Sequence, residues 1–182
     1  SLAVATTSGN TPAHLAAQNG HEGCLRVLHE LGVSLAVANS YGDTPVHSAV
    51  YQGHKECLRV LHELGANIAA VNSYGETPAH LAAGEGQEGC LRVLHELGVS
   101  LAVTDSNGST PAHLASARGQ EECLRVLHEL GTSITAANSD GETPAHLAAR
   151  RGHGCCLREL HKLGVSLAVA DSDGDTPAHS AD

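Results

Sequence analysis

The sequence contains no tryptophan, phenylalanine or methionine, and only three tyrosines among its 182 residues. A single globule of this length would normally fill its core with some large side chains. Here the core must be built from alanine, leucine, valine and cysteine, a composition that suits thin layers in close contact. No signal sequence opens the chain, and no apolar run approaches the roughly 18–20 residues of a membrane-spanning helix, so we expect no membrane partner.

Basic residues are also scarce. The chain has 10 Lys and Arg against 20 Asp and Glu, which gives a formal net charge of −10. Because the phosphate backbone of a nucleic acid rewards a dense basic surface, this balance argues against a nucleic-acid partner. No C-x-x-C pair occurs among the six cysteines, so metal chelation by thiolates has no support.

Five of the cysteines recur at intervals of 33 residues: Cys24, Cys57, Cys90, Cys123 and Cys156. Stacked helices lie about 8–10 Å apart, whereas a disulfide needs Cα atoms within about 7 Å. We therefore predict buried free thiols that act as small hydrophobic residues, with Cys155 as an additional half-exposed thiol. Free thiols favour a reducing compartment, so we expect an intracellular and specifically cytoplasmic location.

One phrase, TPAHLAA, stands at Thr77–Ala83 and again at Thr143–Ala149. Close variants begin at Thr11, Thr44, Thr110 and Thr176, so that six copies follow one another every 33 residues. A threonine can cap a helix and a proline suits its first position, because no N–H is needed there. Each copy therefore predicts the start of a helix.

The stretch 39–71 shows what one copy contains. Its first four residues, Asn-Ser-Tyr-Gly, have the chemistry of a type I turn. A short helix is expected from Pro45 to about Gln52, and a second helix, with a wide apolar stripe, from about Lys55 to Leu64. Neither helix can bury its apolar face within its own repeat, so each must pack on the copies before and after it, which predicts a solenoid.

These phrases, above all T-P-x-H-x-A in a 33-residue period, resemble the ankyrin repeat family over the whole chain. The resemblance implies an all-α ankyrin-repeat solenoid of helix-turn-helix repeats with β-turn or hairpin tips, forming a single domain over residues 1–182. We expect five full repeats with partial repeats at both ends, at 6–38, 39–71, 72–104, 105–137 and 138–170, preceded by 1–5 and followed by 171–182.

The fourteen histidines form two main ladders. The first belongs to the T-P-x-H phrase: His14, His47, His80, His113, His146 and His179. The second lies in the second helices: His29, His62, His95, His128 and His161. Because ligands must converge on one ion, ladder steps of about 8–10 Å argue against a metal site. The resemblance implies that the first ladder bonds helix starts to adjoining turns. The second ladder is expected on a partly solvated face, with weak metal sites as an open alternative, and we expect no cofactor and no catalytic residues.

Sequence differences between the copies concentrate at the turn tips and at the ends of the first helices. The resemblance implies that these two regions line one concave surface on which partners dock, although exposed positions also vary by drift. The tyrosines are expected to anchor a partner, while basic residues of repeats four and five face acidic tips. The expected partner-binding residues are Tyr41, Asp43, Tyr51, Gln52, Tyr74, Glu76, Glu85, Asn107, Arg118, Asp140, Glu142, Arg150 and Arg151.

We therefore predict a non-catalytic interaction module that binds a protein or peptide on its concave face. The near-identity of the copies leaves an alternative open, an engineered or near-consensus scaffold or spacer without a specific partner. Uncapped ends predict weak self-association. Glu159 stands where other copies have valine, and a carboxylate is rarely buried unpaired. We expect its helix to face solvent as a partial cap, and the alternative is that the array continues and tolerates the charge.

Overall fold

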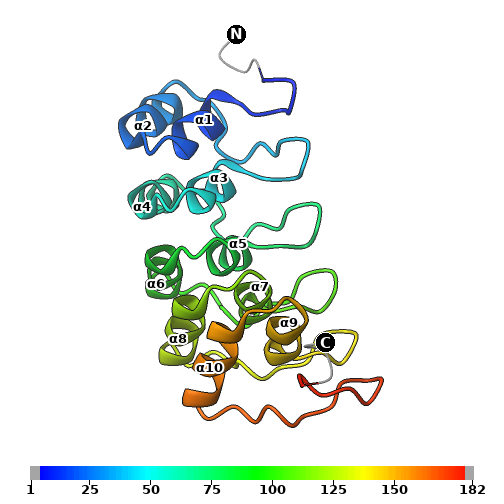
Figure 1. The fold of residues 1–182 in the computed structure, drawn as a ribbon. Coiled ribbons are helices and arrows are strands. Elements are labelled where there is room, and N and C mark those ends of the chain that lie inside the picture. Colours follow the sequence, from blue (N-terminus) through cyan, green and yellow to red (C-terminus); the bar gives the residue numbers. More distant parts are fainter. Residues whose placement is uncertain (1–4, 179–182) are drawn as a thin grey trace.

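The structure, a computed structural model, describes residues 5–178. Within that range it contains ten helices and no strand, arranged as five stacked pairs (Figure 1). The expected all-α solenoid of helix pairs is confirmed. The first helices are α1 (Pro12–Gln18), α3 (Pro45–Tyr51), α5 (Pro78–Gly84), α7 (Pro111–Ala117) and α9 (Pro144–Arg150). The second helices are α2 (Glu22–Glu30), α4 (Lys55–Glu63), α6 (Glu88–Glu96), α8 (Glu121–Glu129) and α10 (Gly154–Lys162).

The helices form two rows beside a third row of turn tips (Figure 1). The first helices occupy the middle row, between the tips and the second helices. None of the helices in the described residues is both long and apolar enough to cross a membrane. Each tip is a tight turn. In repeat two, Asn39 Oδ1 accepts hydrogen bonds from the N–H groups of Tyr41 and Asp43 at 2.9 and 3.0 Å. The first five tips are joined in succession by one backbone bond each, such as Ser73 N–H to the Tyr41 carbonyl at 3.0 Å.

The first-ladder histidines tie each helix start to the tip of the next repeat. In repeat two, the N–H of Thr44 donates to Nδ1 of His47 at 3.1 Å, and Nε2 lies 3.4 Å from the carbonyl oxygen of Glu76. The same two bonds occur in all five described copies. Because Nδ1 accepts, the ring proton must sit on Nε2, so these imidazoles are neutral. The structural role is confirmed; His179 lies outside the described residues.

Burial also favours the neutral form of these rings. The pKa values of four imidazoles are lowered because burial disfavours the charged form, against the opposing effect of nearby carbonyl oxygens and carboxylates: His14, His47, His80 and His113. The second-ladder histidines, by contrast, are exposed along the outer row of helices, as predicted.

The core is made between repeats rather than within them. Valine at one register position of the second helix is 5, 2 and 2% exposed at Val60, Val93 and Val126. The equivalent Val27, in the first described repeat, is 51% exposed because this face of α2 points outward at the N-terminal end of the stack. Cys24 is exposed at the same end, so the prediction that it is buried was wrong. The other four thiols of the cysteine ladder are buried and Cys155 is partly buried, as predicted.

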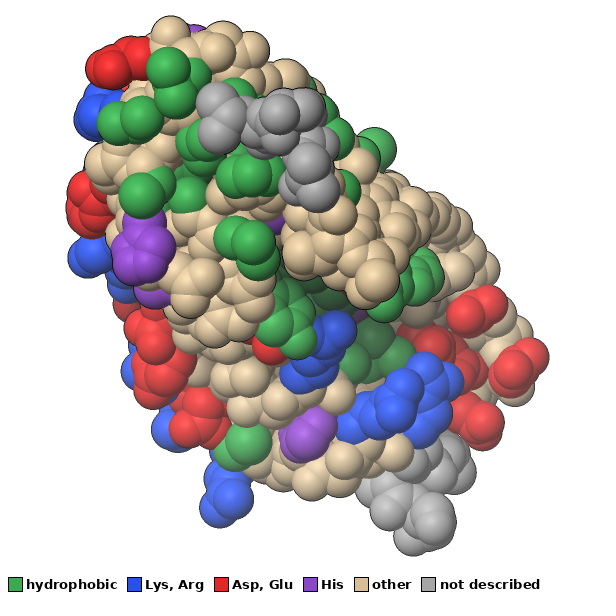
Figure 2. All heavy atoms as spheres, turned by 90° about the horizontal axis from the view of Figure 1, so that it is seen from above, with side chains coloured by type: hydrophobic (Ala, Val, Ile, Leu, Met, Phe, Trp, Pro, Cys, Tyr) green, Lys and Arg blue, Asp and Glu red, His purple; other side chains and the backbone are tan. Residues whose placement is uncertain are grey.

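An arginine–glutamate ladder runs along the outer row of helices. Arg26 lies 2.7 Å from Glu63 in the next repeat, and two further pairs repeat this contact at 2.6 Å, Arg59–Glu96 and Arg92–Glu129. Acidic and basic side chains accordingly alternate along one edge of the molecule (Figure 2).

The last junction replaces this pattern. Lys162 stands at the glutamate position, and Glu159 supplies the carboxylate instead. Arg125 Nε donates to Glu159 Oε1 at 2.8 Å, and Lys162 Nζ lies 3.4 Å from the other oxygen. Glu159 is only 5% exposed, so the expectation that it faces solvent was wrong. The bond from Arg125 lowers the pKa of this carboxyl and keeps it charged.

Candidate functional site

The ends of the first helices and the turn tips enclose a cavity of about 260 Å³ in the first three repeats. It brings together four of the predicted binding residues, Tyr41, Asp43, Tyr51 and Gln52. Its other lining residues are Asn10, Gln18, Asn39, His47, Ser48 and Leu81. We call this cavity the tyrosine pocket.

Both tyrosines of the pocket are available to a partner. The Tyr41 side chain, on the second tip, is 54% exposed, and Tyr51, the last residue of α3, is 51% exposed. The backbone that carries Tyr51 is fixed, because Gln87 Nε2 donates to its carbonyl at 3.2 Å and Gly53 ends the helix turn with a φ of +78°. The Tyr51 ring is therefore exposed at a fixed helix end.

Two carboxylates meet beside the tyrosine pocket. The Nδ2 of Asn72 lies 3.1 Å from Asp43 Oδ1 and 3.1 Å from Glu76 Oε2, so one amide nitrogen serves both. Across residues 5–178, neither carboxylate forms an ion pair. Neighbouring negative charges without a cation make this a part of the surface that favours positive charge.

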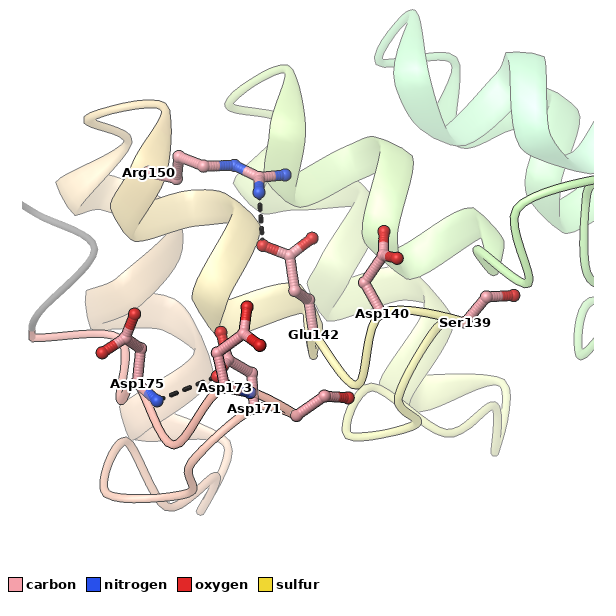
Figure 3. Close-up of a pocket in the computed structure, with 8 residues that line it drawn as sticks. Ser139, Asp140, Glu142, Arg150, Asp171, Asp173 and Asp175 are labelled. Carbon is pink, nitrogen blue, oxygen red and sulfur yellow. Dashed lines mark hydrogen bonds and ion pairs between the residues drawn. The ribbon is translucent and has the colours of Figure 1, made fainter.

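A second cavity, of about 590 Å³, lies at the C-terminal end (Figure 3). Its lining residues are Ser139, Asp140, Glu142, Arg150, Asp171, Ser172, Asp173 and Asp175. We call it the acidic pocket. Arg150 Nη1 lies 2.5 Å from Glu142 Oε1, which confirms that a basic helix end faces an acidic tip. Glu142 itself is buried, at 7% exposure, beneath the arginine.

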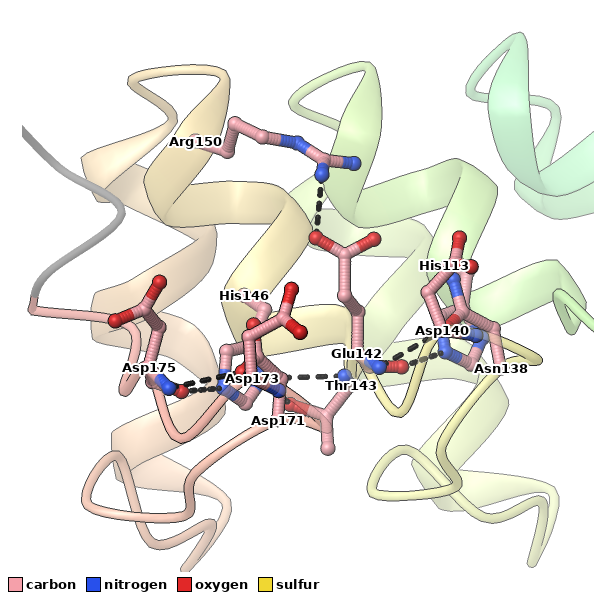
Figure 4. A network of polar contacts seen from close by, with 10 residues as sticks. All are labelled: His113, Asn138, Asp140, Glu142, Thr143, His146, Arg150, Asp171, Asp173 and Asp175. Carbon is pink, nitrogen blue, oxygen red and sulfur yellow. Dashed lines mark hydrogen bonds and ion pairs between the residues drawn. The ribbon is translucent and has the colours of Figure 1, made fainter.

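The acidic pocket rests on the same polar scaffold as the other tips (Figure 4). The N–H groups of Asp173 and Asp175 donate to Asp171 Oδ1 at 3.0 and 2.9 Å. The backbone bond from Asp175 contributes most to lowering the pKa of the Asp171 carboxyl. His146 Nε2 donates to the Asp175 carbonyl at 3.0 Å, which holds this last tip against α9.

The remaining predicted residues lie along the surface between or beside these cavities. Arg118 forms an ion pair with Glu85, not with the acidic tips. Four others line neither the tyrosine pocket nor the acidic pocket: Tyr74, Glu76, Asn107 and Arg151. Tyr74 is 60% exposed on the third tip. In Figure 2, basic side chains gather in the hollow of the molecule, with acidic ones at its rim.

The sequence prediction omitted three aspartates of the acidic pocket, Asp171, Asp173 and Asp175. Their register would have identified them, because they follow Asn39, Tyr41 and Asp43 by four repeat lengths. No group of three or more His, Cys, Asp or Glu side chains is placed to hold a metal ion within residues 5–178.

Comparisons with known proteins agree with this architecture. A family model for ankyrin repeats in three copies matches residues 2–72 and 64–138, and a model for a single ankyrin repeat matches residues 140–172. A search of curated proteins finds no match. Among solved structures, the ankyrin repeat domain of human ASB11 is similar, with a TM-score of 0.87 at 26% identity, and the match covers 100% of this chain and 81% of that one. From its repeats, its stacked helix pairs and these matches, the chain belongs to the ankyrin repeat family.

Proposed function

We propose that the protein binds a protein or peptide partner on the concave surface formed by the turn tips and the ends of the first helices. Ankyrin repeat domains are in general interaction modules rather than enzymes. The observation that carries the proposal is the placement of the tyrosines. Tyr41, Tyr51 and Tyr74 are each at least half exposed in repeats two and three, and two of them line one cavity.

Exposed tyrosines in a chain with so few aromatic residues are informative. Tyrosine is enriched among interface hot spots because it buries a large apolar ring at low entropic cost and keeps a polar tip. A scaffold or spacer without a specific partner does not need exposed tyrosine rings on one side of two adjacent repeats. The two proposals therefore differ in a measurable way, in whether binding depends on the tyrosines.

The test begins with the intact chain as bait for proteins of the source cell, followed by purification of each captured protein. Calorimetric titration then compares wild type with a Tyr41→Ala/Tyr74→Ala variant and with a His62→Ala/His95→Ala control, which removes two exposed rings from the outer helices. We expect about a tenfold or greater loss of affinity for the tyrosine variant, because hot-spot side chains contribute more than about 1 kcal/mol each. The control should change affinity by less than about twofold. Equal affinities for all three proteins would refute the tyrosine anchors.

The free, mostly buried thiols favour a reducing compartment, so we place this interaction inside the cell. Weak self-association is a secondary proposal. It rests on the apolar N-terminal face of the first described repeat, where Leu15, Val27 and Leu31 are 41, 51 and 60% exposed. Sedimentation velocity over a range of concentrations would detect it, and a constant monomer coefficient would contradict it.

A further inference from the structure

Repeats two and five place different side chains at the same two register positions. In repeat five these positions hold Glu142 and Arg150, whose side chains form an ion pair across the end of α9 (Figure 4). In repeat two, 99 residues earlier, they hold Asp43 and Tyr51. The chain thus shows, in repeat five, where a guanidinium sits when it lies on the carboxylate of a tip.

In repeat two the acidic partner is kept and the basic one is missing. Asp43 forms no ion pair in the described part of the chain, and the Glu76 carboxylate shares the same Asn72 amide donor. Two like charges held this close repel each other, and a cation between them would relieve that repulsion. The register equivalent of Arg150 is Tyr51, which lines the tyrosine pocket together with Asp43, so the carboxylate there lacks the guanidinium that Glu142 has in repeat five.

We propose that the tyrosine pocket receives the guanidinium of an arginine side chain presented by the partner, with the Asp43 carboxylate as its counter-ion and the Tyr41 and Tyr51 rings as its walls. This inference rests on the proposed function and specifies the partner as a basic one. An arginine fits better than a lysine, because a planar guanidinium stacks on aromatic rings and still offers donors to a carboxylate. The net charge of −10 draws such a partner in from a distance.

The test uses small probes, so that it does not depend on finding the natural partner. N-acetyl-arginine methylamide is titrated into the isotope-labelled chain and followed by NMR, beside its uncharged counterpart, N-acetyl-citrulline methylamide. We expect saturable shifts centred on Tyr41, Asp43 and Tyr51, with binding by the arginine probe about fivefold or more tighter than by citrulline. The lysine analogue should fall between the two.

Matched variants copy the internal comparison. Tyr51→Arg introduces the guanidinium that repeat five already has, so it should pair with Asp43 and abolish the shifts in this pocket. Asp43→Asn with Glu76→Gln should weaken arginine binding to the citrulline level. Asp173→Asn with Asp175→Asn, at the exposed tip of the acidic pocket, is the charge-matched control and should leave the tyrosine pocket unaffected. Circular dichroism and melting curves check that each variant is folded.

The converse variant, Arg150→Tyr, uncovers Glu142 and should create a second set of arginine-dependent shifts at repeat five. Equal binding of arginine and citrulline, lysine binding as tight as arginine, no shifts at all, or full binding by Tyr51→Arg would each overturn the inference. The proposed function can survive that result, because a partner whose affinity depends on the tyrosines but not on Asp43 would contradict only the arginine assignment. If the captured partners ignore the tyrosines while the arginine probe binds as expected, only the proposed function fails.

Discussion

Ser116 offers the sharpest test of how the repeats pack. It lies in α7, its side chain is fully buried, and its Oγ has no hydrogen-bond partner among the described residues. Alanine stands at the same register position in three other repeats, Ala17, Ala83 and Ala149. A buried hydroxyl without a partner costs about 1–3 kcal/mol, and serine is also a poorer helix former than alanine by roughly 0.5 kcal/mol. We therefore expect Ser116→Ala to raise the free energy of unfolding by about 1.5–3.5 kcal/mol.

The chain provides a reciprocal variant for the same reasoning. Ala83 in α5 is fully buried, so Ala83→Ser should lower the free energy of unfolding by a similar amount, about 1.5–3.5 kcal/mol. Ser48→Ala, at a partly exposed position in α3, should change it by less than about 0.5 kcal/mol. Urea denaturation followed by circular dichroism measures all three. An unchanged or lower unfolding midpoint for Ser116→Ala would show that the hydroxyl is bonded, and the reasoning would be wrong.

Three further outcomes are expected. Four first-ladder imidazoles have folded pKa values below the unfolded value of about 6.5: His14, His47, His80 and His113. The unfolded chain therefore binds more protons, so the stability that these rings contribute is complete above about pH 6.5 and should fall as the pH drops below it. Melting temperatures that stay level between about pH 7.5 and 5.0 would contradict this. Val93→Ala should lower the free energy of unfolding by about 2 kcal/mol and Val27→Ala by less than about 0.5 kcal/mol, because only the first side chain is enclosed by its neighbouring repeats; equal losses in urea denaturation would refute the repeat-on-repeat core. A thiol reagent added to the native chain should modify Cys24 first, because burial raises the pKa of Cys57 to about 11 and that of Cys90, Cys123 and Cys156 to about 12; mass spectrometry of the labelled peptides would show the order.

The fold could be predicted from sequence because its signals are local and repeated six times. The Thr44-Pro45 helix start and the His47 bond depend on residues within one copy and on the backbone of the next. The helix ends at Gly53 and Gly65 need only a residue that accepts a positive φ, which both have. Averaging over the copies removes the uncertainty of any single one.

The predictions that were wrong concern residues whose burial depends on neighbours that differ from those in the rest of the array. Cys24 carries the same local phrase as the buried thiols but lies on an outward-facing helix, and no pattern within one repeat can show that. The burial of Glu159 was missed because its partners stand in two places, Arg125 in the preceding repeat and Lys162 one turn further along the helix. Pairing between side chains 34 residues apart requires the stacking geometry.

The proposed binding surface shows the same division. Its expected location rests on where the copies vary, but the grouping of its residues could not be predicted from one copy. Arg118 reaches back to Glu85 because its side chain lies over Gly84, which leaves room for it. The shared Asn72 amide that links Asp43 to Glu76 depends on distances across a junction between repeats. Such contacts are properties of the stacked surface rather than of the sequence of one unit.

The arginine ladder on the outer helices also bears on how the gene can change in length. Every described repeat carries an arginine at the same register position, and every repeat from the second onward meets it with a carboxylate, whether at the glutamate position or, in repeat five, from Glu159. An unequal crossover that removed 33 codons in phase from the interior would therefore join two units whose charges still match. Repeat five could follow any of its predecessors, so the array can shorten or lengthen by recombination without leaving its buried carboxylate alone.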